Sequence, residues 1–379
     1  MLELTPHTAA SYLRERGSIG TRERVEIREL SGGVSNTVLL VHRPDSSGGD
    51  FVLKQALPRL KVQQEWLCSI ERIWREVEVL EICGHLLASG GRQPPDTNSS
   101  SPWTTTVPQI LFSDRENYCY AMTAAPSSHK TWKELLLAGE ADPQIAAACG
   151  TLLGRLHAAS WNNKDLGHQF AEKKYFYDLR IDPYYRELIR IHPQLSDLLN
   201  HLTSGCDLHP RCLVHGDFSP KNLLISPGQL MLIDFEVGHY GDPTFDLGFL
   251  TSHLALKAFA ARRNYRSYLN LIDTFGKAYN AEVQTTVETN APKVVRAAGF
   301  NWGTTAIDSE VTLLHALLSR HFFACLLARV DGKSQVTYLA EDLRHEVRQF
   351  VLRELKYSPT SDFDTAIASL GNKLQLLFG

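Results

Sequence analysis

The chain has 379 residues, of which 43% are hydrophobic and 21% charged, the balance of a globular protein long enough for two lobes. Its 39 basic and 42 acidic side chains nearly cancel, so nothing favours a nucleic-acid partner, which normally requires clustered Lys and Arg. Seven cysteines without a C-x-x-C pair predict neither a zinc site nor a disulfide framework. The first residues lack the pattern of a signal peptide and no apolar run could cross a bilayer, so we expect a cytoplasmic protein without membrane contact.

The first part of the chain is rich in predicted strands. Residues 24–30 and 37–43 form two strand-like runs, and the glycines of "SGGVSN" between them predict a hairpin turn. The run "FVLKQAL", residues 51–57, predicts a third strand. Residues 65–87 carry apolar side chains at helical spacing and therefore predict a helix.

A segment rich in Ser, Gly, Pro and Thr, residues 89–106, predicts a mobile loop. It is followed by two further predicted strands at 107–114 and 117–124.

The pattern becomes mainly helical after Pro126. An amphipathic helix with an acidic, proline-containing start is predicted at 142–161, and a series of helices from about Ser267 onward. We therefore divide the chain into a small strand-rich lobe, residues 1–125, and a larger helical lobe, residues 126–379.

The stretch "LVHGDFSPKNLLI", residues 213–225, places a polar loop between two short apolar strands. Asp217 follows Gly216 on an expected tight turn, and Asn222 comes five residues later. Asp234, in "LIDFE", ends another apolar strand 17 residues beyond Asp217. Carboxylate and amide oxygens are the ligands that Mg²⁺ prefers, and a remaining carboxylate can accept the proton of an attacking hydroxyl. This set of groups predicts phosphoryl transfer.

The motif "HGDFSPKN" followed by "IDFE" resembles the catalytic and metal-binding loops of the aminoglycoside phosphotransferase and choline kinase family, a small-molecule branch of the protein-kinase-like fold. The resemblance implies an α+β fold of two lobes, in which a β-rich nucleotide-binding lobe precedes a helical catalytic and acceptor-binding lobe. It also implies ATP and Mg²⁺ as cofactors. It makes Asp217 the catalytic base, His215 a residue that organises the loop, and Asn222 and Asp234 the metal ligands.

The parts of a nucleotide site occur upstream in the order that the resemblance implies. Lys54 matches the strand lysine that holds the α- and β-phosphates, and Glu76 is its first candidate partner, with Glu78 as the alternative. "LSGGVSN" matches the loop over the phosphates, and the hinge that receives adenine falls at 122–124. The resemblance thus implies eight nucleotide-binding residues: Ser31, Gly32, Gly33, Ser35, Lys54, Glu76, Met122 and Ala124.

Two features depart from protein kinases. The phosphate loop is "GGVSN" rather than G-x-G-x-x-G, and the metal motif is Asp-Phe-Glu, without the glycine that lets this segment flip. We therefore expect no regulation by such a flip. Downstream, "GDPTFDLG" resembles the family's next segment, in which Asp246 would brace the catalytic loop, and we interpret His157 as a structural histidine.

Two polar segments of the helical lobe are candidates for acceptor binding. "YDLRIDPYYR", residues 177–186, and "LARVDGKS", residues 327–334, combine charged and hydroxyl groups that could hydrogen-bond a sugar or a phosphorylated group. They could equally be helix-capping and surface residues. The candidate acceptor-binding residues are Arg180, Asp182, Tyr184, Glu236, Arg329 and Asp331.

The function that this pattern favours is an ATP-dependent transfer of phosphate to a hydroxyl of a small molecule. Residues 53–80 resemble the corresponding stretch of methylthioribose kinases, which also carry "KQALP", although those enzymes usually have proline where Phe235 stands here. A pentose-like sugar is therefore the first candidate acceptor, and an aminoglycoside or amino alcohol the alternative. A non-catalytic pseudokinase would have lost one of the key groups, and a protein kinase would need an "APE"-like segment. The oligomeric state is left open.

Overall fold

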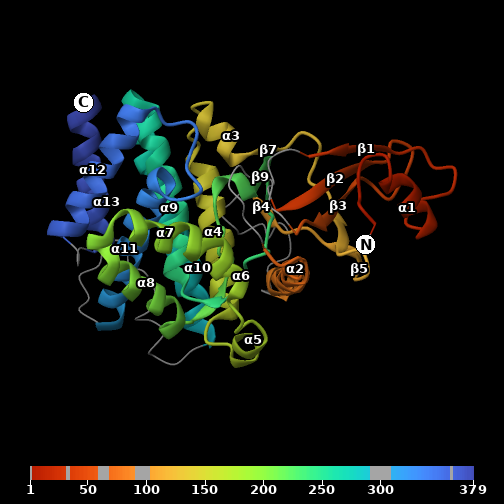
Figure 1. The fold of residues 1–379 in the computed structure, drawn as a ribbon, viewed down its shortest axis with the longest axis horizontal. Helices are drawn as coiled ribbons and strands as arrows, with labels where there is room; N and C mark the ends of the chain where they lie inside the picture. The colour runs from red at the N-terminus through yellow and green to blue at the C-terminus, as the bar shows by residue number, and fades with distance from the viewer. Residues whose placement is uncertain (1, 31–34, 59–67, 90–102, 291–308, 359–361) are drawn as a thin grey trace.

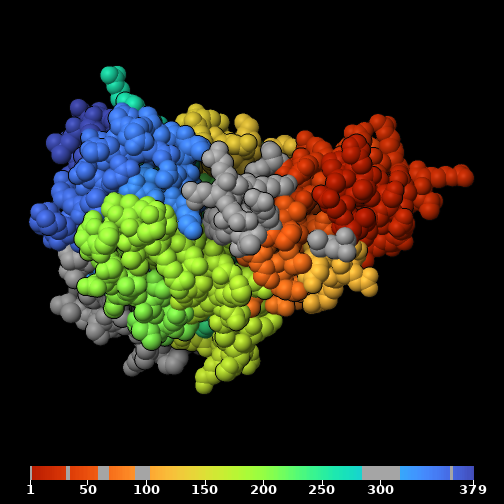
Figure 2. Space-filling view, in the orientation of Figure 1, coloured from red at the N-terminus to blue at the C-terminus, as the bar shows by residue number. Residues whose placement is uncertain are grey.

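The computed structural model describes residues 2–30, 35–58, 68–89, 103–290, 309–358 and 362–379. It confirms the α+β fold of two parts, with an antiparallel sheet at the N-terminal end and helices at the C-terminal end (Figure 1). In the space-filling view the two parts form separate masses that meet in the middle of the molecule (Figure 2). Within the described residues, no helix has both the length and the apolar character needed to span a membrane.

The N-terminal sheet is antiparallel, in the order β1-β2-β3-β6-β5, and it contains the predicted hairpin and the next three predicted strands. The central strand, β3, is buried on both faces because α1 (Ala9–Glu15) packs on one face and α2 (Arg72–Ser89) on the other. The helix α1 was not predicted. The strands are β1 (Glu26–Glu29), β2 (Asn36–His42), β3 (Phe51–Ala56), β5 (Ile110–Asp114) and β6 (Cys119–Thr123).

The helix α2 (Arg72–Ser89) begins later than the sequence predicted, since the described residues 68–71 before it are not helical. The reason lies in Arg72, which is fully buried and donates hydrogen bonds to the carbonyls of Cys68 and Ser69. These bonds hold the preceding chain in a turn. The apolar residues whose spacing predicted the helix, including Ile73 and Val77, lie on the face of α2 that is buried in the same core as the sheet.

The end of the predicted mobile loop is instead a strand, which corrects that prediction. Thr104–Thr106 forms β4 and pairs in parallel with β10 (Gln229–Leu232), more than a hundred residues away in the sequence. Local composition cannot predict that a segment pairs with a strand far away in the sequence, although the three β-branched threonines suit a strand. This second sheet has the order β4-β10-β9-β7, with β7 at Lys130–Thr131 and β9 at Leu223–Ser226. The division at residue 125 remains a prediction.

The helical part is built around two closely packed helix pairs, α4 with α10 and α9 with α11. Asp142 and Asp242 cap α4 and α9, each followed by a proline at the first helical position. Gly248 lets α9 and α11 approach closely, because a Cβ there would lie 2.8 Å from the Cβ of His321. The α-helices that follow β7 are α3 (Trp132–Leu137), α4 (Pro143–Ser160), α5 (Lys164–Gln169), α6 (Lys174–Phe176), α7 (Glu187–Ile191), α8 (Ser196–Leu208), α9 (Pro243–Ala261), α10 (Tyr265–Asn290), α11 (Ser309–Asp331), α12 (Glu341–Tyr357) and α13 (Phe363–Phe378). The remaining elements are the π-helix η1 (Tyr177–Arg186), the 3₁₀ turns η2 (Pro193–Leu195), η3 (Pro220–Asn222) and η4 (Arg262–Asn264), and the paired strands β8 (Cys212–Val214) and β11 (His239–Gly241).

Candidate active site

The loop that carries Asp217 leaves β8 through a tight turn at Gly216. Gly216 has a φ of +73°, and a Cβ there would lie 3.0 Å from both the carbonyl oxygen and Cγ2 of Val237. A glycine is therefore needed for both its backbone conformation and its lack of a side chain. The turn aims Asp217 away from the strand, and η3 then brings Asn222 back beside it.

Asp246, at the start of α9, fixes the backbone of this loop. Its carboxylate accepts hydrogen bonds from the amides of His215 at 2.7 Å and Gly216 at 2.8 Å. His157 Nε2 lies 3.3 Å from the same carboxylate, and His157 Nδ1 lies 3.0 Å from the hydroxyl of Tyr279. His157, which we interpreted as structural, thus positions the carboxylate of Asp246 that holds the backbone of the loop.

His215 connects the loop to the segment before Asp234. Its Nδ1 accepts a hydrogen bond from the amide of Asp217 at 3.1 Å, and its Nε2 donates to the carbonyl of Ile233 at 3.1 Å. Burial lowers the pKa of His215 below its usual value, outweighing nearby carboxylates such as that of Asp246. A neutral ring in this tautomer positions the two acidic residues but carries no spare proton.

The carboxylate of Asp217 receives three donors on one oxygen. Its Oδ2 lies 2.7 Å from Arg180 Nη2, 2.9 Å from Lys221 Nζ and 2.8 Å from Asn222 Nδ2. Burial raises the pKa of Asp217, but Arg180 and Lys221 outweigh burial and hold it below its usual range. No described residue forms a hydrogen bond or ion pair with Oδ1, so this oxygen can accept a hydrogen bond from another molecule.

Lys54 on β3 links α2 to the second acidic segment. Its Nζ donates to Glu76 Oε1 at 2.7 Å and to Asp234 Oδ1 at 2.8 Å, so the partner on α2 is Glu76 and not Glu78. Burial lowers the pKa of Lys54, but Asp234 and Glu76 outweigh burial and raise it well above its usual value. Burial together with Asp234 raises the pKa of Glu76 to about 7, against the opposing effect of Lys54.

Asp234 sits in a strained conformation, with a φ of +75° that a non-glycine residue seldom adopts. Burial raises the pKa of Asp234, but Lys54 and Lys221 outweigh burial and lower it well below its usual range. Its carboxylate is therefore ionised at all ordinary pH values. Such strain commonly occurs at functional positions.

The groups around Asp234 fit a hard divalent cation. Carboxylate oxygens of Asp234, Glu76 and Glu236 lie within 4.8 Å of one another, and Glu76 Oε2 is buried without a hydrogen-bond partner in the described part of the chain. Asn222 donates to Asp217 through its Nδ2, which leaves its carbonyl oxygen for a metal. Oxygen donors of this kind suit Mg²⁺.

Glu236 lies at the contact between this segment and the sheet rather than among the other acceptor-binding candidates. Its carboxylate accepts hydrogen bonds from Ser35 at 2.8 Å, Asn36 at 3.1 Å and Arg72 at 3.1 Å. Ser35 is thus placed beside the metal segment. The other residues proposed for the phosphate loop, Ser31, Gly32 and Gly33, lie outside the described residues.

The arrangement agrees with comparisons to known proteins. A profile described as the phosphotransferase enzyme family matches residues 26–279. The chain belongs to this family. A methylthioribose kinase of Bacillus cereus (strain ATCC 10987 / NRS 248) is 24% identical over 90% of this chain and 92% of its own, and one of Bacillus mycoides (strain KBAB4) is 25% identical over 70% and 69%.

Solved structures confirm the fold. A choline kinase from Cryptosporidium parvum superposes with a TM-score of 0.53 at 11% identity, covering 98% of this chain and 100% of that one. An amicoumacin kinase solved with AMP-PNP, Ca²⁺ and its namesake ligand gives a TM-score of 0.51 at 13% identity over 96% and 99%. The phosphotransferase therefore has the two-lobed kinase-like fold that the resemblance implied.

The proposed hinge of the phosphotransferase ends β6. The amide of Ala124 faces the carbonyl of Asp50 at 3.4 Å, a long hydrogen bond at the end of the sheet, and Met122 is buried in the apolar core that also includes residues of α2. Neither contact tests adenine binding, so this role remains a prediction.

The remaining acceptor candidates occupy different surroundings. Arg180 turns inward from η1 to Asp217, whereas Asp182 is more exposed and pairs with Arg186. Tyr184 accepts a hydrogen bond from Arg329 at 3.1 Å. Asp331 instead accepts hydrogen bonds from His192 and Arg348, at distances of 2.6 to 2.9 Å, which makes it part of a buried ion-pair network.

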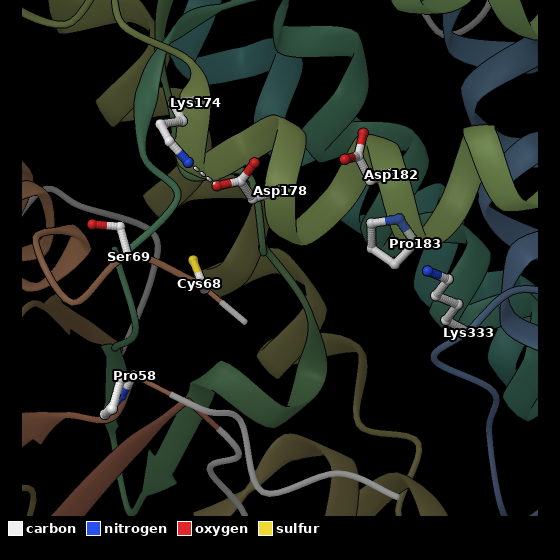
Figure 3. A pocket seen from close by; sticks show the side chains of 8 residues that line it. All are labelled: Pro58, Cys68, Ser69, Lys174, Asp178, Asp182, Pro183 and Lys333. Carbon is white, nitrogen blue, oxygen red and sulfur yellow. Dashed lines mark hydrogen bonds and ion pairs between the residues drawn. The ribbon is translucent and has the colours of Figure 1, made fainter. Parts of the chain in front are cut away.

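A pocket of about 590 Å³ lies between the two lobes beside η1 (Figure 3). Lys174 and Asp178 form an ion pair at one side of it, and the backbone amide of Lys333 donates to the carbonyl of Pro183 at the other. Its lining residues are Pro58, Cys68, Ser69, Lys174, Asp178, Asp182, Pro183 and Lys333.

Two residues of the phosphotransferase site had no assigned role. Lys221 lies 2.9 Å from Asp217 and 3.8 Å from Asp234, so it connects the two acidic residues. Its position four residues after Asp217 in the same loop was the available signal. Arg72 contacts Glu236 and backbone carbonyls on both sides of the sheet–helix junction, and nothing in the local sequence distinguishes it from other helix arginines.

Proposed function

We propose that this phosphotransferase uses ATP and Mg²⁺ to phosphorylate a hydroxyl of a sugar-type small molecule, such as a pentose derivative. The observation that carries the proposal is the joint placement of Lys54, Glu76, Asp217 and Asp234 in one paired network. The sugar acceptor is supported by similarity to methylthioribose kinases along 90% of the chain. The cytoplasmic setting remains part of the proposal.

The donor side follows from the contacts of Lys54. Its ammonium is charged and held in place by Glu76 and Asp234, so it is prepared to bind the phosphates of ATP. Asp234 and the carbonyl oxygen of Asn222 would hold the metal, with Glu236 and Glu76 close by. A divalent cation bound there supplies neutralisation of the phosphate charge.

The acceptor side follows from the free oxygen of Asp217. Oδ1 can accept a hydrogen bond from the acceptor hydroxyl and orient its oxygen toward the γ-phosphorus. The new O–P bond forms as the bond to the β-phosphate oxygen breaks, and the hydroxyl proton passes to Asp217. Because the pKa of Asp217 is lowered, the carboxylate acts mainly in positioning and takes the proton late.

The test is a direct assay with a small set of acceptors. Purified protein is incubated with ATP and MgCl₂ and with ribose, methylthioribose, choline or kanamycin, while ADP release and product mass are followed. A singly phosphorylated sugar supports the proposal. A phosphorylated amino alcohol or aminoglycoside would move the assignment to that alternative, and nucleotide binding without any transfer would favour a non-catalytic role.

A further inference from the structure

Four polar residues of the helical lobe form a group that we call the basic cluster: His253, Lys257, Arg329 and Tyr338. His253 and Lys257 lie one turn apart on α9, and Arg329 lies near the end of α11. Tyr338 lies in the segment after α11, where its ring centroid is 5.2 Å from the ammonium of Lys257. The cluster thus brings together three parts of the sequence.

Several polar atoms of the basic cluster have few or no hydrogen-bond partners among the described residues. Lys257 is 2% exposed, yet within the described ranges its ammonium has a single hydrogen bond, at 3.3 Å, to the carbonyl of His253 on its own helix. The Tyr338 hydroxyl and Arg329 Nε are buried, and no described residue hydrogen-bonds to either. Buried polar groups nearly always have partners in native proteins, so these atoms indicate a place for a bound molecule.

The described part of the chain also supplies no counter-charge to the cluster. Among described residues, neither Lys257 nor Arg329 forms an ion pair with a carboxylate, although buried cations are normally paired. Burial, together with Arg329 and Lys133, lowers the pKa of Lys257 to about 7. Burial, together with the positive charges of Arg329 and Lys257, lowers the pKa of His253 well below its usual value. An anion bound here would relieve the repulsion among these groups.

The basic cluster is close to the catalytic carboxylate. The ring of Phe249 lies 5.0 Å from the ring of His253 and 5.7 Å from that of Tyr184. The same ring lies 5.9 Å from the guanidinium of Arg180, whose Nη2 is 2.7 Å from Asp217. A few side chains therefore separate the cluster from Asp217, on the helical side of the loop where the acceptor must bind.

We propose that the basic cluster binds an anionic group of the acceptor, a carboxylate or a phosphate, while the acceptor hydroxyl lies at Asp217. This inference rests on the proposed function, because it names the class of acceptor for that transfer. Lys257, Arg329 Nε and the Tyr338 hydroxyl would donate charge-assisted or neutral hydrogen bonds to the anion. A cationic acceptor would be repelled by the same groups.

Binding measurements test the inference without requiring turnover. Calorimetry of the intact protein, with and without AMP-PNP and MgCl₂ to fill the donor site, would compare ribose, ribonate and ribose 5-phosphate. We expect at least one of the two acids to bind about tenfold more tightly than ribose, since charge-assisted hydrogen bonds are the stronger ones. The two acids distinguish a carboxylate from a phosphate, and equal or weaker binding of both relative to ribose would overturn the inference.

Variants locate the anion. In Lys257→Met and Tyr338→Phe the preference for the acid over ribose should fall to about threefold or less, with the affinity for ribose retained. Lys373→Met, which removes a cation that pairs with Glu346 elsewhere in the helical lobe, should keep the full preference. A preference that survives in Tyr338→Phe and in a folded Lys257→Met would place the anion elsewhere and sink the inference. Phosphorylation of neutral methylthioribose in place of the acids would do the same while leaving the proposed function intact.

Discussion

The acidic end of the site and the basic cluster are both rich in buried charge, but they differ in how that charge is balanced. The carboxylates of Asp217 and Asp234 each have at least one cation within 3 Å, supplied by Lys54, Arg180 and Lys221. In the basic cluster, the described residues supply cations and no carboxylate near Lys257.

The two regions therefore differ in whether their charged groups already have hydrogen-bond or ion-pair partners among the described residues of the protein. A paired network is already in its working geometry before substrates arrive, so it can position ATP and a hydroxyl at little further cost. For the donors of the basic cluster, which no described residue pairs fully, we propose a partner on another molecule. Replacing residues in each region should therefore affect different quantities, turnover and nucleotide affinity in the first and acceptor affinity in the second.

The largest effect should follow from Asp217→Asn. The amide cannot accept the hydroxyl proton, and its weaker contact with Arg180 and Lys221 loosens the loop. We expect turnover to fall at least about a hundredfold, the scale of a lost general base. Steady-state kinetics gives the turnover, and calorimetry should show nearly unchanged affinity for ATP. A variant with normal turnover would remove Asp217 from the mechanism.

Asp234→Ala tests the other half of the paired region. It removes the carboxylate that we propose as a metal ligand and one of the two partners of Lys54, so Mg²⁺-dependent ATP affinity should fall by about 10–100-fold. Calorimetry with ATP in MgCl₂ and in EDTA measures the metal-dependent part. Equal affinity for Mg·ATP in variant and wild type would exclude Asp234 as a ligand.

The paired region was largely predictable from the sequence, and the basic cluster was not. Asp217, Asn222 and Asp234 stand at a characteristic spacing in one short stretch, so local order was enough to group them, and the structure brings them together. Their roles stay predictions. The choice between Glu76 and Glu78 needed the structure, because two positions on a helix point in different directions and only the placement of α2 against β3 decides which reaches Lys54.

The basic cluster and β4 could not be predicted from the local sequence. His253 and Lys257 lie in a helix, α9, that is buried nearly all round, so their spacing gave no sign of a polar site. Arg329 was a candidate only because it stands in a polar segment. The pairing of β4 with β10 likewise depends on a contact between distant parts of the chain. Contacts of this kind follow from packing, which local patterns do not encode.

Arg329→Ala tests whether the unpaired region serves the acceptor. Arg329 Nη1 donates to the hydroxyls of Ser334, at 2.6 Å, and Tyr184, at 3.1 Å, while its Nε remains unpartnered among the described residues. We expect the acceptor KM to rise about tenfold with the ATP KM little changed, since a lost buried donor typically costs about 1–3 kcal/mol.

Ser334→Ala is the matched control for Arg329, because it removes a hydroxyl partner and keeps the guanidinium. If Arg329 only holds this loop, both variants should lower the melting temperature and neither should change the acceptor KM. Parallel kinetics and melting curves separate the two roles.

The smallest expected effect is on the free energy of unfolding, which the buried charge of Lys257 should lower. Burial, with Arg329 and Lys133, lowers the folded-state pKa of Lys257 to about 7, whereas the unfolded value is about 10.4. Between these pH values the unfolded chain binds more protons than the folded chain, so this residue makes stability rise with pH. As pH falls through about 7, the folded protein must hold a buried charge that no described carboxylate pairs, and the destabilisation is complete below that value.

Lys257→Met should therefore raise the melting temperature by a few degrees at pH 6, and by less at pH 9, because the methionine removes a group whose charge is unfavourable when folded. Scanning calorimetry of both proteins without ligands at the two pH values measures the difference. Lys373→Met, which loses an ion pair with Glu346, should show no gain at either pH. A melting temperature that drops equally at both pH values in Lys257→Met would mean that the ammonium has a partner and stabilises the lobe. The contrast between the paired and unpaired regions would then be wrong. A gain larger at pH 6 than at pH 9 would show a cation kept at a cost to folding, which is the pattern expected where a residue is retained for binding.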